Sequence, residues 1–350
     1  MIKKRTSLAF LTLFSMVMIL ACSSKDEQAV KLATQASHYD ADALRKLSAM
    51  ASAGDAAAQY GMAVYYQKLN YQPGNKALEF TWASRSAAQG NVDAEALLAY
   101  DYMVGEGIPK DAQKTLAWVR KTAMQNNPWA EAVLGGMYMN GDGVTQDYAQ
   151  AFDWYTKSAN QGDAEGEYGL GSLYDAGHGV RQDYTKAMEW YKKSADQGNA
   201  DADYNIAELY LNGHGVDPDV DQVVHWFKKA ANEGNTSAEE TLGRMYQDGT
   251  GVPKDLQKAS YWLGQSVGHG NLDAEQYDDA VNKLIAAQEQ AAQQQQNEEQ
   301  RQQAQLAQQK FHHDSVCKDI AIMISRDKAS GNTDGLNASS NLYNMQGCDH

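Results

Sequence analysis

Tryptophan recurs at one fixed interval through most of the chain. Six of the seven tryptophans lie 36 residues apart, and only Trp129 falls outside the series. The six are Trp82, Trp118, Trp154, Trp190, Trp226 and Trp262. Tyrosine keeps the same period at Tyr66, Tyr102, Tyr138, Tyr174, Tyr210 and Tyr246. A constant period of this length is the signature of a solenoid built from stacked supersecondary units.

Glycine and capping residues divide each unit into two helices. Glycine opens nearly every unit, as at Gly90 and Gly162, with Asn126 in the one exceptional place. These residues suit a left-handed helix C-cap, and the Asp or Asn that follows suits an N-cap. A Gly-x-Gly pair then predicts the end of the first helix, and an aspartate seven residues before the tryptophan predicts the start of the second. We therefore expect an all-α chain of helix-turn-helix repeats.

The aromatic residues of the repeat are predicted to form its core. Four residues after the opening glycine stands a small residue, an apolar residue usually follows at eight, and the periodic tyrosine comes at twelve. This spacing places the three on one helical face. Because the aromatic columns accompany small residues at fixed helical positions, core packing is favoured over a sugar-binding stack.

The third unit, together with the glycine that opens the fourth, is a clear example of the full pattern. Its elements are Leu134-Gly135, Tyr138, Gly141-Asp142-Gly143-Val144, Asp147, Trp154-Tyr155, Lys157-Ser158-Ala159 and Gln161-Gly162. The pattern resembles the Sel-1-like repeat family, a relative of the tetratricopeptide solenoids, over roughly residues 40 to 290. The resemblance implies an α/α superhelical solenoid of 36-residue repeats that binds other proteins through a curved surface.

The departures from this pattern predict the domain organisation. The predicted segments are a signal peptide (1–21), a tether (22–39), an N-terminal capping helix (40–53), a solenoid of six full units and an atypical last helix (54–287), a Gln-rich helical extension (288–310) and a tail (311–350). In the tail, an apolar run at 316–324 favours a short helix, and the glycines and asparagines after it favour a loop.

The amino terminus reads as a lipoprotein signal. Lys3, Lys4 and Arg5 precede an apolar run that is short for a membrane span, and Cys22 follows a small residue where such a peptide is cleaved. This arrangement resembles the bacterial lipobox, which implies acylation of Cys22. Ser23 resembles the residue that sorts lipoproteins to the outer membrane. We expect a lipid-anchored protein of the outer membrane that faces the periplasm.

The charge of the chain limits its partners. The formal net charge is −15, and residues 1–21 carry three positive charges and no negative one, so the remaining chain carries −18. Nucleic acids and anionic membrane surfaces require basic patches. We expect no nucleic acid partner, and we expect periplasmic or envelope proteins as partners.

Two cysteines remain beyond the anchor, Cys317 and Cys348. An oxidising periplasm favours a disulfide between them. The alternative is a zinc site in which His312, His313 and His350 supply further ligands. The disulfide is the favoured interpretation, and no metal or cofactor is predicted.

Two histidines offer a second, weaker metal hypothesis. His178 and His214 occupy equivalent places in successive Gly-x-Gly turns, where stacking could bring them together. The equivalent place in other units is taken by Glu106, Asp142 and Thr250. This variety favours an exposed position that accepts different residue types.

Acidic residues recur near the start of the first helix. They lie three and five residues after the opening glycine, at Asp93, Glu95, Glu131, Glu165, Glu167, Asp201, Asp203, Glu239, Asp273 and Glu275. The favoured interpretation is exposed pairing with a base ten residues earlier, as between Lys157 and Glu167, together with favourable placement near a helix N-terminus. The alternative is an anionic groove that binds a basic segment of a partner.

Catalytic motifs are absent from the sequence. It has no Gly-x-Ser-x-Gly, phosphate-binding loop or His-Glu-x-x-His motif. Cysteine-rich members of the resembled family have been associated with penicillin-like compounds, which suggests an envelope enzyme or a cell-wall or β-lactam-binding protein as the alternative. Residues 23–316 contain no cysteine, so a non-catalytic scaffold is the predicted function.

Overall fold

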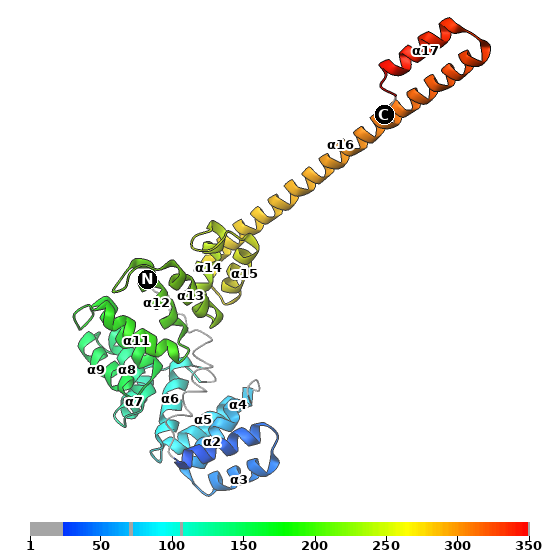
Figure 1. Cartoon of the computed structure of the whole chain (residues 1–350). Helices are drawn as coiled ribbons and strands as arrows, with labels where there is room; N and C mark the ends of the chain where they lie inside the picture. Colours follow the sequence, from blue (N-terminus) through cyan, green and yellow to red (C-terminus); the bar gives the residue numbers. More distant parts are fainter. Residues whose placement is uncertain (1–23, 70–72, 106–107, 349–350) are drawn as a thin grey trace. The chain divides into compact units, whose positions relative to one another are not determined.

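The computed structural model describes residues 24–69, 73–105 and 108–348 (Figure 1). The predicted signal peptide and Cys22 lie outside these ranges. The described chain is α-helical apart from one 3₁₀ turn and its connecting segments, which confirms the all-α solenoid. It divides into a repeat body that ends at Tyr277 and a carboxyl-terminal arm, Asp278–His350. No helix in the described ranges is both long enough and apolar enough to cross a membrane.

The repeat body consists of helix pairs that pack in sequence order, each pair against the next. The pairs are α2 (Ser24–Ser37) with α3 (Ala41–Ser52), α4 (Ala56–Lys68) with α5 (Pro73–Ala87), α6 (Val92–Val104) with α7 (Ala112–Ala123), α8 (Pro128–Asn140) with α9 (Tyr148–Asn160), α10 (Ala164–Ala176) with α11 (Tyr184–Asp196), α12 (Ala200–Asn212) with α13 (Val220–Asn232), and α14 (Thr236–Asp248) with α15 (Leu256–Gly268). A 3₁₀ turn, η1 (Leu272–Ala274), follows them.

The caps lie where the sequence places them. In the third unit, the Asn127 side chain accepts from the Ala130 N–H, and Asp147 accepts from the Ala149 and Gln150 N–H groups. Gly141 ends α8 with φ 75°, and Asn126 takes the opening position with φ 59°. A left-handed residue at each bend lets two helices of about 13 residues fold back on each other.

The core is centred on a different column of residues from the predicted aromatic columns. All six periodic tryptophans are only half-buried, and among the periodic tyrosines only Tyr246 is fully buried. The residue after each tryptophan is buried instead, at Ala83, Val119, Tyr155, Tyr191, Phe227 and Leu263. Five of the tryptophans, all but Trp262, still pack against the core, and a basic side chain lies over each of their rings. Lys157 Nζ, for example, lies 3.7 Å from the centroid of the Trp154 ring.

The predicted tether is wrong within the described residues, because residues 24–37 form α2. This helix packs against both α3 and α4. Ala29, Ala33 and Ala36 are buried, and their three- and four-residue spacing makes one apolar face. The capping helix α3 is therefore the second helix of a complete pair.

The arm consists of α16 (Glu275–Ser330), except for its first three residues, and α17 (Thr333–Met345). The Gln-rich extension is helical and forms the middle of α16, where its side chains are exposed. The predicted loop in the tail is wrong, because only Gly331 and Asn332 interrupt the helices, and Asn332 caps α17 by accepting from the Gly335 N–H. The helices fold back on each other as a hairpin, and the predicted Cys317–Cys348 disulfide closes it.

Candidate functional site

A groove runs along the repeat body where the turns between successive helix pairs meet. Its volume is about 700 Å³. It extends from Lys25 and Asp26 at the start of α2 to Gln197 after α11, so it follows five consecutive helix pairs. The first turns of α4, α6, α8 and α10 contribute Ala56, Val92, Pro128 and Ala164 to its lining. The repeat geometry therefore builds one continuous concave surface from short segments that are 36 residues apart.

Glutamine repeats along this groove. Gln89, Gln125, Gln161 and Gln197 each precede an opening residue and line the surface. Each donates a hydrogen bond from Nε2 to the side chain 30 residues earlier in its own unit, at 2.8 Å to Gln59, 2.7 Å to Glu95, 2.6 Å to Glu131 and 2.8 Å to Glu167. These glutamines keep the same period as the tryptophans, but of the four only Gln161 was part of the predicted pattern, and no role was predicted for it.

Three of these bonds end on buried carboxylates, and the acceptor of the first is the amide oxygen of Gln59. Glu95, Glu131, Glu167, Asp203 and Glu239 are at most 6 % exposed, so the prediction of exposed pairs is wrong for them. Burial raises the pKa of Glu131 and Glu167, and the glutamine bond and a nearby lysine partly counter it. These side chains are structural, since a buried carboxylate requires a partner in the protein.

Lysines reach these acids from within the same unit. Lys121 Nζ lies 2.8 Å from Glu95 Oε1, and Lys229 Nζ lies 2.8 Å from Asp203 Oδ1. The predicted pairing of Lys157 with Glu167 is wrong, because Lys157 acts on Glu131 and Lys193 acts on Glu167. The lysine and the acid of each pair are 26 residues apart in sequence. They meet because antiparallel packing brings the end of the second helix beside the start of the first.

The fifth and sixth units replace the glutamine and give the acid a different partner. His269 Nδ1 lies 2.9 Å from Glu239 Oε1, where the other units have a glutamine bond. In the fifth unit Glu233 takes the glutamine position, and Lys229 supplies the hydrogen bond to Asp203. Burial raises the pKa of Asp203, and the opposing effect of Lys229 is smaller, so the pKa of this carboxyl stays above its usual value.

The second row of acids has varied surroundings. Asp93 is buried and lines the groove. Glu165 Oε1 accepts from Asn199 at 3.3 Å, and Asp201 Oδ1 accepts from Asn235 at 2.6 Å, so these bonds link neighbouring units. Burial, with Asp163 and Asp201 nearby, raises the pKa of Glu165 to about 8. Asp273 and Glu275, outside the groove, are exposed.

The positions of these acids differ from the predicted anionic groove. Six of the ten predicted groove acids are buried, and internal partners neutralise or hydrogen-bond Glu95, Glu131, Glu167, Asp203 and Glu239. The groove lining is dominated by glutamine, asparagine and small residues. A partner that enters it meets amide groups and helix N-termini more often than free carboxylates.

The two turn histidines each stack on a tyrosine of the preceding unit. The His178 ring lies 4.3 Å from the Tyr148 ring, and the His214 ring lies 4.3 Å from the Tyr184 ring. Each stacked pair is a packing contact between two successive units. Stacking on a tyrosine therefore accounts for His178 and His214 at these two positions without a bound metal.

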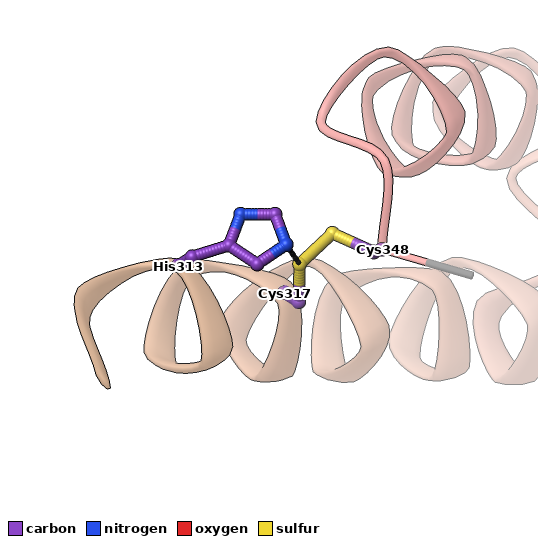
Figure 2. A group of neighbouring side chains, drawn as sticks. All are labelled: His313, Cys317 and Cys348. Carbon is purple, nitrogen blue, oxygen red and sulfur yellow. Dashed lines mark hydrogen bonds between the residues drawn. A yellow bond between two sulfur atoms is a disulfide. The ribbon is translucent and has the colours of Figure 1, made fainter. Parts of the chain in front are cut away.

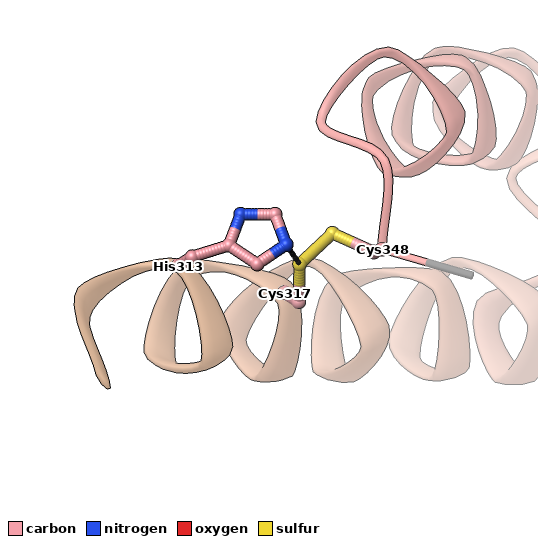
Figure 3. The surroundings of a disulfide bond; sticks show 3 residues. All are labelled: His313, Cys317 and Cys348. Atoms are coloured by element: carbon pink, nitrogen blue, oxygen red, sulfur yellow. Dashed lines mark hydrogen bonds between the residues drawn. A yellow bond between two sulfur atoms is a disulfide. The ribbon is translucent and has the colours of Figure 1, made fainter. Parts of the chain in front are cut away.

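The tail cysteines and one histidine form a compact cluster (Figure 2). His313 and Cys317 are one helical turn apart on α16, and His313 Nε2 lies 3.6 Å from Cys317 Sγ. Cys348 approaches from the segment after α17 and bonds to Cys317 (Figure 3). His312 is exposed and is not part of the cluster, and His350 lies outside the described residues.

Comparison with known families gives the chain its classification. The Sel1 repeat family matches residues 56–91, 92–127, 130–163, 164–199, 200–235 and 237–271. The chain belongs to the Sel1 repeat family. Sel1 repeats commonly mediate protein–protein interactions. A search of the curated proteins found no match.

Two solved structures show the same architecture. The protein is similar to c5321, described as a protective antigen of uropathogenic Escherichia coli strains with an SLR fold, at 33 % identity and a TM-score of 0.57. That match covers 70 % of this chain and 52 % of the other, so this chain spans about half the length of c5321. A Sel1 repeat protein from Oxalobacter formigenes is 30 % identical with a TM-score of 0.52, covering 66 % of this chain and 86 % of its own.

Proposed function

We propose that the protein is a non-catalytic adaptor of the bacterial cell envelope. In this proposal the acylated Cys22 anchors it to the outer membrane, and its groove binds segments of other envelope proteins. The observation that carries this proposal is the continuous groove along five helix pairs. Its lining is contributed by repeated turns, so a bound segment contacts several units at once. The membership in a repeat family that commonly mediates protein interactions supports this role.

The glutamine row suits recognition of a peptide backbone. A carboxamide has two N–H donors and a carbonyl acceptor. In Gln161 and Gln197, the bond to a buried carboxylate uses one donor and holds the side chain in place. Preorganised amide groups lose little conformational entropy when a ligand binds.

Site-specific photocrosslinking in living bacteria tests the binding surface. A photoreactive amino acid would replace Val92 in the groove, with Leu211, which is 52 % exposed on α12 and outside the groove, as the matched control. We expect discrete adducts with envelope proteins from position 92 and none from position 211. Equal adducts from both positions, or none from either, would contradict the groove as the binding site.

Membrane fractionation tests the anchor separately. The wild-type protein should incorporate a labelled fatty acid and sediment with outer membranes. Cys22→Ser should lose the label and leave that fraction, because the anchor depends on acyl chains buried in the bilayer. An unlabelled wild-type protein would overturn the lipoprotein assignment and leave the groove experiment unaffected.

A further inference from the structure

The disulfide of the arm lies within reach of a third metal-binding side chain. The ligand atoms of His313, Cys317 and Cys348 all lie within 4.8 Å of one another (Figure 2). His313 is exposed and both cysteines are half-buried, so solvent reaches the cluster. A histidine and two thiolates are ligands that zinc prefers.

The geometry points to a zinc site that replaces the disulfide when the cysteines are reduced: we propose that His313 Nε2 and the Cys317 and Cys348 thiolates then hold one zinc ion. The proposal is independent of the groove, since it concerns the arm alone. Zinc with three protein ligands keeps a fourth position for water or an external ligand.

The separation of His313 from Cys317 already fits such a site. Tetrahedral zinc with bonds of about 2.3 Å to sulfur and 2.0 Å to nitrogen places these two ligand atoms about 3.5 Å apart. The observed separation is 3.6 Å. Helical spacing of four residues sets this distance, because it places both side chains on one face of α16. Only the two sulfurs would have to separate, to about 3.8 Å.

Little else in the arm holds the hairpin closed. Between Asp278 and Met345, the buried side chains are Val281, Ile320 and Ser339, and Val281 lies more than 30 residues before Cys317. The Cys317 and Cys348 Cα atoms are 5.5 Å apart. A zinc ion that joins the same two residues would restore the link that reduction removes.

The chemical step requires a reductant. A dithiol transfers two electrons and two protons to the disulfide, which yields two cysteine thiols and the cyclic disulfide of the reductant. Zinc then binds the two thiolates and the neutral imidazole, and two protons are released to solvent. A disulfide oxidant reverses the exchange: it accepts two electrons and two protons to become a dithiol, the bond between Cys317 and Cys348 re-forms, and zinc is released.

Zinc titration of the full-length chain tests the proposal. Every sample would carry Cys22→Ser, so that Cys317 and Cys348 are its only thiols. Oxidised and dithiothreitol-reduced protein, freed of reductant under argon, would be titrated with zinc against a chromophoric chelator. We expect one additional zinc ion in the reduced sample, and cobalt in place of zinc should give the near-ultraviolet thiolate charge-transfer band.

Two neighbouring histidines provide the matched variants. We expect His313→Ala to weaken zinc binding by roughly 100-fold or more, and His312→Ala to bind as the parent does. Circular dichroism of the oxidised samples verifies that each variant folds, and in the reduced parent zinc should restore the helical signal lost on reduction. Equal zinc binding by reduced and oxidised protein, or equal binding by the two variants, would overturn the site.

Discussion

The repeat body and the arm are both helical, yet they are stabilised in different ways. Each first helix of the body packs against its partner and against adjacent units, and buried residues occur in every pair. In the 56-residue α16 only Val281 and Ile320 are buried. Helices in the body depend on tertiary burial, whereas the long helix of the arm depends on the propensity of Gln, Ala and Glu.

This difference between the repeat body and the arm indicates where substitutions are tolerated. In the body a residue at a fixed register position meets the same neighbours in every unit, so its burial is dictated by the repeat. In the arm most side chains face solvent, and the disulfide supplies the long-range constraint. A variant that affects one region should leave the other unaltered.

The largest difference is expected for a large-to-small change in the body. Phe227 is fully buried, and Phe227→Ala should lower the free energy of unfolding of the repeat body by about 3–5 kcal/mol, measured by urea denaturation. Ile322 in α16 is 55 % exposed, and Ile322→Ala should change stability by less than about 0.5 kcal/mol. Similar losses from both variants would show that the regions are stabilised alike.

The second prediction concerns the arm. For cysteines 31 residues apart, the disulfide should stabilise the hairpin by about 3–4 kcal/mol. Cys348→Ser should therefore increase hydrogen exchange in α17 toward that of an unfolded peptide, while exchange in α4–α15 stays as in the parent. Protection of α17 that survives the substitution would indicate packing contacts stronger than the two buried side chains near it suggest.

The smallest effect should come from pH and arise in the body. The folded-state pKa of Glu165 is raised to about 8, so its folded form binds a proton that the unfolded form releases near pH 4.5. Stability should fall as pH rises from 5 to 8, by about 1–2 kcal/mol after allowance for partial solvent access.

The matched variants for this measurement are Glu165→Gln and Glu189→Gln, since Glu189 is exposed on α11. The first should reduce the dependence of the melting temperature on pH and raise stability at pH 8, and the raised pKa values of Glu131, Glu167 and Asp203 should leave a residual slope. The second should leave the slope as in the parent. A wild-type slope in Glu165→Gln would assign the pH dependence to other groups.

The features predicted from sequence are those that depend on local chemistry. Asn127 and Asp147 were identified as caps because an N-cap bonds to backbone only two or three residues away. The left-handed turn at Gly141 follows from its missing side chain. The 36-residue period extended these local rules over the body and gave the fold.

Features that depend on stacking were predicted poorly. The burial of Glu131 follows from its bond to Gln161, which is close only after the two helices pack antiparallel. The half-exposure of Trp154 follows from Lys157 lying over its ring. The helix at 24–37 was missed even though Ala29, Ala33 and Ala36 share a face, because small residues give a weak hydrophobic signal.

The glutamine–carboxylate bond has a consequence for how such a chain grows. Glu131 and Gln161 both belong to the unit 126–161, and Glu167 and Gln197 both belong to the next one. Each 36-residue segment thus encodes the acceptor of a buried bond together with its donor. An in-frame duplication or deletion of one whole segment keeps each of these carboxylates together with its glutamine, so the number of units can change over generations while these buried bonds are retained.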